Sequence, residues 1–198
     1  MSQTFPHRTA SPSVAGSPRV GILALQGDVR EHGRVLRSLG AEVVSIRRPD
    51  ELLAVDGLVL PGGESTVIDK LARGFGVAEP LSRAIAAGLP VYGTCAGLIL
   101  LADRLEDGIE GQRTFGGLDV TVRRNAFGGQ VESFEASVTV PAFGGPPVDA
   151  AFIRAPLVVS TGPGVEVLAE LDDGGIVAVR QGNAIGTAFH PEVSGERR

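Results

Sequence analysis

The chain has 198 residues, of which 43% are hydrophobic, and a formal net charge of -5 at neutral pH. This length predicts one domain with a sizeable core, and the acidic balance argues against a nucleic-acid-binding surface. No apolar run approaches the length of a membrane span, so we expect no membrane association. The single cysteine cannot form an internal disulfide, which favours a reducing, cytoplasmic location.

The first 18 residues differ in composition from the rest of the chain. They are rich in Ser, Thr and Pro and lack the apolar stretch of a secretory signal. We therefore predict a disordered tail over residues 1–18, followed by one domain over residues 19–198.

Short apolar runs alternate with helical patterns in the first half of the domain. We expect strands at 20–26, 41–46, 57–60 and 89–92, helices at 29–39, 66–73 and 79–87, and a helical turn at 50–54. The alternation predicts an α/β fold in three layers, with helices on both faces of a mainly parallel sheet. Sites in such sheets lie at the carboxyl ends of the strands. Gln26, Gly62-Gly63 and Cys95 each follow a different strand and are expected to converge there.

The second half of the chain is dominated by strand patterns, and helical patterns are scarce. We expect strands at 118–124, 131–140, 151–154, 165–171, 176–181 and 184–189, and a Gly/Pro-rich loop at 142–147. No repeat or domain boundary is visible. The sequence therefore predicts that the sheet gains antiparallel strands at one side.

The stretch around Cys95 has the order strand, sharp turn and buried helix. Small residues flank the thiol in Gly93-Thr94-Cys95-Ala96-Gly97, which is typical of a strained turn that exposes a nucleophile. The helix expected to begin at Ala96 directs its free N–H groups at the sulfur and favours the thiolate. A lone cysteine between apolar elements is otherwise a small buried hydrophobe, but a core position would not require the two glycines.

A cysteine nucleophile needs a base, and the chain has only three histidines. His7 lies in the tail, and His32 is expected on a solvated helix face. His190 ends a predicted strand, and Glu192, two residues later, can accept its other ring N–H. The ordinary alternative is a strand-end histidine beside a solvated carboxylate.

An acyl-transfer nucleophile also needs hydrogen-bond donors for the developing oxyanion. The backbone N–H of Ala96 follows the cysteine directly. Gly63 is a second candidate, because glycine lets the backbone approach a substrate closely. A tight turn after a strand would explain Gly62-Gly63 equally well.

These residues together resemble a known family. The segments at 61–65, 93–97 and 189–192 are similar to the three signatures of class I, triad-type glutamine amidotransferases. More narrowly, the chain resembles the family of glutaminase subunits of pyridoxal 5′-phosphate synthase. The segments that carry this narrower resemblance are residues 25–32, 62–66, 93–102, 123–128, 130–135, 152–156 and 189–192.

The resemblance implies a role for each matching residue. Cys95 would attack the carboxamide carbon of L-glutamine, His190 would serve as base and acid, and Glu192 would orient the histidine. Gly63 and Ala96 would supply the oxyanion N–H groups. The positions that match the family's glutamine-binding residues are Gly63, Glu64, Ser65, Arg124, Ile153 and Arg154.

The resemblance also implies a protein partner, because the ammonia released would otherwise be lost to solvent. In the family, the glutaminase docks on a synthase subunit in a hetero-oligomeric ring complex, and residues 26–32 together with the loop after Gly62 are candidate docking surfaces. No zinc-type cluster or nucleotide-binding glycine motif is present in the sequence, so we expect neither a metal nor a cofactor.

Two alternatives to this interpretation stay open at this point. One is the glutaminase of another pathway, such as histidine biosynthesis, or a γ-glutamyl hydrolase, although the segments at 124–128 and 152–156 argue against it. The other is a non-enzymatic binding module on the same fold, in which Cys95 is merely structural.

Overall fold

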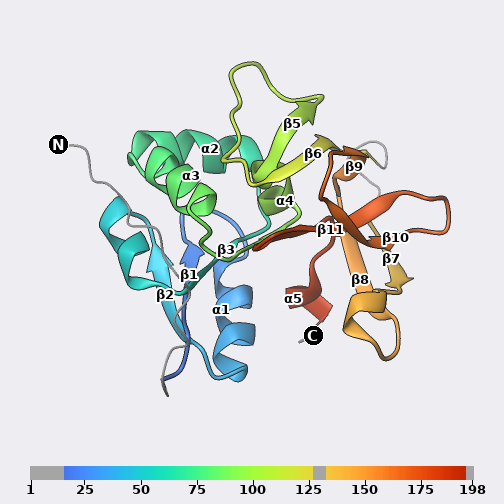
Figure 1. The fold of residues 1–198 in the computed structure, drawn as a ribbon, viewed down its shortest axis with the longest axis horizontal. Coiled ribbons are helices and arrows are strands. Elements are labelled where there is room, and N and C mark those ends of the chain that lie inside the picture. The colour runs from blue at the N-terminus through green and yellow to red at the C-terminus, as the bar shows by residue number, and fades with distance from the viewer. Residues whose placement is uncertain (1–15, 127–132, 195–198) are drawn as a thin grey trace.

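A computed structural model describes residues 16–126 and 133–194 of the chain (Figure 1). A ten-stranded sheet has the order β2-β1-β3-β4-β12-β11-β9-β6-β5, with β10 paired to β11. Its strands are β1 (Arg19–Leu23), β2 (Glu42–Ile46), β3 (Gly57–Leu60), β4 (Val91–Thr94), β5 (Ala102–Glu106), β6 (Leu118–Arg123), β9 (Leu157–Thr161), β10 (Glu166–Glu170), β11 (Ile176–Gln181) and β12 (Ala184–Thr187). A separate antiparallel pair consists of β7 (Ser133–Val138) and β8 (Val148–Ile153).

Strand direction divides the large sheet into two parts. The five strands from β2 through β12 are mutually parallel. Beyond β12 the sheet continues through antiparallel pairings of β11, β9, β10 and β6, and it ends with β5 parallel to β6. The predicted α/β fold with antiparallel additions at one side is therefore confirmed.

Helices cover both faces of the parallel part. The helices of the described residues are α1 (Val29–Ser38), η1 (Pro49–Ala54), α2 (Ser65–Gly74), α3 (Ala78–Ala86), α4 (Ala96–Leu101), η2 (Pro141–Phe143) and α5 (Pro191–Ser194). Figure 1 shows α1 and α5 together on one side of the parallel strands and α2 and α3 on the other. No helix within the described ranges is long and apolar enough to cross a membrane.

The second half departs from the sequence prediction in three places. β7 and β8 pair only with each other, so they do not extend the large sheet. β5 was not predicted, and its sequence ADRLE forms a strand because it pairs with β6. β9 was not predicted, although its β-branched sequence LVVST favours a strand.

Two predictions fall partly outside the described residues. These are the tail, at positions 1–15, and the strand at 131–140, at positions 131–132. The first strand begins at Arg19 and ends at Leu23, whereas the sequence predicts a strand at 20–26. Tail and domain boundaries otherwise stay a prediction.

Candidate active site

Cys95 occupies the turn between β4 and α4 and has a backbone conformation rare for a residue with a side chain. Its φ is 49° and its ψ is -100°. The turn is held because the Cys95 N–H donates to the Thr187 carbonyl on the neighbouring β12 at 2.8 Å. Such strain persists only where the surroundings fix it, and it concentrates at functional sites. Cys95 is buried, and α4 begins directly after it.

Three glycines let α4 lie directly on the sheet. A Cβ on Gly97 would lie 2.1 Å from the Leu60 carbonyl oxygen of β3. A Cβ on Gly93 would lie 2.6 Å from the Gly97 carbonyl, and one on Gly186 would lie 2.5 Å from the Leu98 side chain. These approaches fix the position of the helix and therefore of the thiol at its start.

His190 lies beside this turn, after the end of β12. Its backbone N–H donates to the Ala151 carbonyl of β8 at 3.1 Å, which connects the segment to the small sheet. Its Nδ1 lies 2.8 Å from Glu192 Oε1, and its ring also interacts with the Cys95 thiol. Both His190 and Glu192 are buried, so Glu192 is not the solvated carboxylate of the alternative interpretation.

Electrostatics at His190 favour a charged ring. Burial lowers the pKa of His190, but hydrogen bonds with Asp28, Cys95 and Glu192 together outweigh that effect and raise its pKa to about 12. An imidazolium beside a thiol at a helix N-terminus stabilises the thiolate, which is the reactive form of cysteine. The structure thus brings Cys95, His190 and Glu192 into one chain of interactions.

Two residues of the site were misjudged from the sequence. Asp28 precedes α1, where an aspartate typically caps a helix, but its side chain makes no capping hydrogen bond, and its Oδ2 lies 3.4 Å from His190 Nδ1. His32 was expected on a solvated face and is instead only 4% exposed. Its Nε2 lies 3.0 Å from Thr94 Oγ1 and 3.4 Å from Glu192 Oε1. The i, i+4 spacing of Asp28 and His32 placed both on one helix face and was a usable signal.

The glutamine-binding candidates of the 61–65 segment lie at the start of α2. The Gly63 φ of 149° lies in the region that favours glycine, and a Cβ there would lie 2.5 Å from Gln26 Oε1. The same oxygen accepts a hydrogen bond from the Glu64 N–H at 2.7 Å. The Glu64 carboxylate then caps α2 by accepting from the Thr66 and Val67 N–H groups at 3.3 and 3.1 Å.

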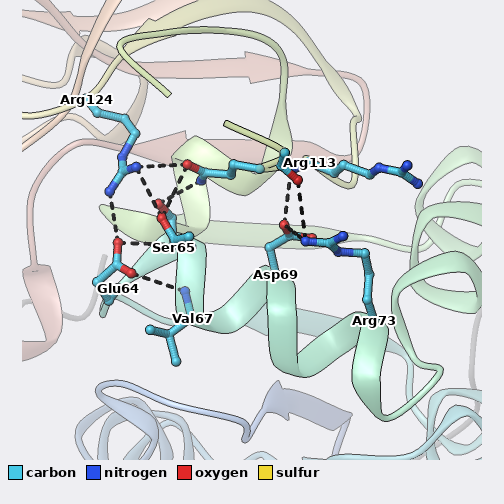
Figure 2. A network of polar contacts seen from close by, with 10 residues as sticks. Glu64, Ser65, Val67, Asp69, Arg73, Arg113 and Arg124 are labelled. Atoms are coloured by element: carbon cyan, nitrogen blue, oxygen red, sulfur yellow. Dashed lines mark hydrogen bonds and ion pairs between the residues drawn. The ribbon is translucent and has the colours of Figure 1, made fainter. Parts of the chain in front are cut away.

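Arg124 reaches this helix start from the end of β6 (Figure 2). Its Nη2 lies 2.8 Å from Glu64 Oε1, and its Nη1 donates to Thr66 Oγ1 and Gln112 Oε1 at 3.2 and 2.8 Å. Its Nε is buried and has no hydrogen-bond partner among the described residues. Gln112 was not singled out from the sequence, because it lies in none of the motifs described above. These contacts and the buried Nε show that Arg124 is not an unpaired surface charge.

Ile153 and Arg154 lie where β8 ends. The Ile153 carbonyl oxygen is 4.0 Å from Cys95 Sγ, so this strand end borders the thiol. Arg154 has a φ of 45° and is exposed. The structure therefore places the Ile153 backbone at the thiol and leaves the Arg154 side chain at the surface.

Within the described ranges, only one compact group of side chains could hold a metal ion. Asp28, His190 and Glu192 offer ligand atoms that lie within 4.8 Å of one another. His190 Nδ1 is already 2.8 Å from Glu192 Oε1, and the ring also interacts with Cys95. The donor set is therefore arranged to orient an imidazole, and the expected absence of a metal stays a prediction.

Comparison with known proteins identifies the family. The sequence matches the SNO glutamine amidotransferase family over residues 22–198. The chain belongs to this family. It is 66% identical over 185 residues to the pyridoxal 5′-phosphate synthase subunit PdxT of Leifsonia xyli subsp. xyli, with 93% of each chain covered. The subunit of that name from Clavibacter sepedonicus is 64% identical over 181 residues, which cover 91% of this chain and 87% of the relative.

A solved structure supports the fold of this SNO-family chain. A crystal structure of a glutamine amidotransferase superposes with a TM-score of 0.83 at 45% identity and covers 90% of this chain and 93% of the other. The membership that the 61–65, 93–97 and 189–192 segments indicated is confirmed by this likeness and by the family match.

Proposed function

We propose that this chain is the glutaminase subunit of a pyridoxal 5′-phosphate synthase and hydrolyses L-glutamine to L-glutamate and ammonia. The observation that carries the proposal is that the buried His190 interacts with the elbow cysteine Cys95 and lies 2.8 Å from Glu192, in a chain 66% identical to a PdxT subunit. A structural cysteine would need neither the strained turn nor the histidine.

The reaction is an acyl transfer in two halves. The Cys95 thiolate attacks the carboxamide carbon, and the tetrahedral intermediate collapses as His190 gives its proton to the departing nitrogen, which leaves as ammonia. A glutamyl thioester remains on sulfur. His190, now neutral, takes a proton from water, which attacks the thioester and releases glutamate, and the thiolate and imidazolium are restored. Glu192 keeps the ring oriented by accepting from Nδ1 at 2.8 Å.

The oxyanion of each tetrahedral intermediate would be held by backbone N–H groups of Ala96 and Gly63. Ala96 is the first residue of α4, so its N–H belongs to the free donors at a helix N-terminus. Gly63 follows β3 in a conformation that favours glycine. Removing one such donor typically costs about 10²–10³-fold in kcat.

Glutamine would bind between the start of α2 and the end of β8. Arg124 is the natural partner for a carboxylate because its buried Nε lacks a hydrogen-bond acceptor among the described residues. Glu64 and Ser65 lie beside it at the α2 N-terminus, and the Ile153 carbonyl borders the thiol from β8, with Arg154 next in the chain. Glu64 is the candidate acceptor for the substrate ammonium group.

The partner would be a synthase subunit that receives ammonia through the protein interior, within a ring of several copies in the cytoplasm. Residues 26–31 and the segment after Gly62 border the site and stay candidates for the docking surface. His32 does not belong to it because its side chain is buried.

The test is glutamate release from glutamine by wild type and Cys95→Ala, each with and without the cognate synthase subunit. We expect release that rises with the partner and is lost in the variant. Release that needs Cys95 but ignores this partner would favour another amidotransferase or a hydrolase. The absence of release in both conditions would favour the binding module.

A further inference from the structure

The polar network at the glutamine-binding candidates extends to a loop that no sequence motif marked. Residues 109–113, here called the 109–113 loop, lie between β5 and β6 and bring Gln112 against the start of α2. Gln112 Nε2 donates to Ser65 Oγ at 3.0 Å, and its Oε1 accepts from Arg124 Nη1 at 2.8 Å. One amide thus connects two residues assigned to glutamine binding.

The hydroxyls that Gln112 satisfies are buried. Ser65 is 2% and Thr66 is 4% exposed, and Thr66 Oγ1 lies 3.4 Å from Gln112 Oε1. Buried polar groups that lose their partners are costly, so the start of α2 depends on this amide. Arg124 depends on it too, since Gln112 and Glu64 hold opposite ends of the guanidinium.

The loop itself is anchored one helical turn further along α2, as Figure 2 shows. Asp69 is buried, and its carboxylate accepts the Arg113 N–H at 3.0 Å. Arg73 pairs with both Asp69 oxygens at 2.9 and 2.8 Å and reaches the Gly111 carbonyl at 3.4 Å. The contacts on both sides of Gln112 therefore fix the backbone that carries it.

We propose that Gln112 is a positioning residue for glutamine, which holds the Arg124 guanidinium and the Ser65 hydroxyl in the geometry that binds the substrate, and that Asp69 acts through it by anchoring the 109–113 loop. The inference rests on the proposed glutaminase function. It assigns Gln112 no contact with the reacting atoms, so its loss weakens binding and spares the chemistry at Cys95.

The test replaces Gln112 with methionine, which has a similar length and no hydrogen-bonding amide. With the synthase subunit present, we expect KM for glutamine to rise about tenfold, as for the loss of one charge-assisted hydrogen bond, with kcat within about threefold of wild type. The glutamine concentration that half-protects Cys95 from iodoacetamide should rise by the same factor, which gives a readout independent of turnover.

Two control variants separate positioning from general damage. Gln181→Met removes another half-buried amide, which accepts the Asp119 N–H at 2.6 Å far along the sheet, and should leave KM unchanged. Arg113→Ala keeps the backbone N–H that binds Asp69 and should also leave KM unchanged. Asp69→Asn should raise KM, and adding it to Gln112→Met should raise KM little further, because both act on one contact.

The outcomes are distinct. A Gln112→Met enzyme with wild-type KM and wild-type protection overturns the positioning role, while Cys95-dependent turnover in the wild type leaves the proposed function intact. Equal tenfold effects in Gln181→Met would also overturn it. A wild type that neither turns over glutamine nor is protected by it overturns the proposed function, and the role of Gln112 with it.

Discussion

Gly97→Ala should displace the proposed nucleophile, Cys95, which lies two residues earlier in the chain. The added Cβ would lie 2.1 Å from the Leu60 carbonyl oxygen and 3.0 Å from the Leu60 Cβ. Carbon and oxygen in contact are normally about 3.3–3.6 Å apart, so relieving the contact needs a shift of about 1.2–1.5 Å between α4 and β3. Leu60 is a fully buried strand residue and cannot yield easily.

Both stability and activity should respond to that shift. Overpacking of this kind costs about 1–3 kcal/mol, which corresponds to a fall of roughly 2–12 °C in Tm for a chain of this size. A displacement of about 1 Å at the reacting atom costs about 100-fold in rate. Because α4 begins directly after Cys95, we expect kcat for glutamine to fall by about that factor.

The assay is glutamate release with the synthase subunit, together with a thermal melt. Gly74→Ala is the matched control, since Gly74 ends α2 and a Cβ there has no neighbour within 4 Å. It should melt no lower than wild type. A Gly97→Ala protein with unchanged Tm and kcat would refute the packing argument, and one with reduced Tm but normal kcat would refute its link to the thiol.

Three further predictions follow from the site. Glu192→Gln should lower kcat by about 10²–10⁴-fold with little change in KM, since the proposed role of the carboxylate is to orient His190 and not to bind substrate. A rise in KM as large as the fall in kcat would contradict this role. Burial lowers the pKa of His32 below 6.5, so the unfolded chain binds more protons there and stability falls as pH drops below about 6.5. In chemical denaturation, the free energy of unfolding of His32→Gln should fall less than that of wild type as the pH drops. A pKa of His32 above 6.5, measured by NMR titration of the folded protein, would refute this prediction. Glu64→Ala removes the α2 cap and the Arg124 ion pair, so it should cost about 1 kcal/mol and raise KM, as measured by melting and kinetics; a lower KM would show that the pair blocks the site.

Much of the active site was visible in the sequence because its signals are local. The elbow at Cys95 consists of one strand, one turn and one helix that follow one another in the chain. Its glycines indicate close packing, which the structure shows at Gly97. His190 and Glu192 are two residues apart, so their hydrogen bond needs no knowledge of the fold. Apolar runs and the glycines after them likewise marked the parallel strands β1, β3 and β4 and the helices between them.

Contacts between distant segments could be decided only by the tertiary structure. His32 and Thr94 are 62 residues apart, and the burial of His32 follows from α1 packing beside α5, which no helical pattern contains. Gln112 and Ser65 are separated by 47 residues, and an amide in a polar loop carries no local sign of function. The strand β5 exists because β6 pairs with it, against the preference of its charged sequence. Composition and periodicity thus determined the α/β frame, and local motifs indicated Cys95 and His190 as candidate nucleophile and base, whereas long-range packing decided which polar side chains surround them.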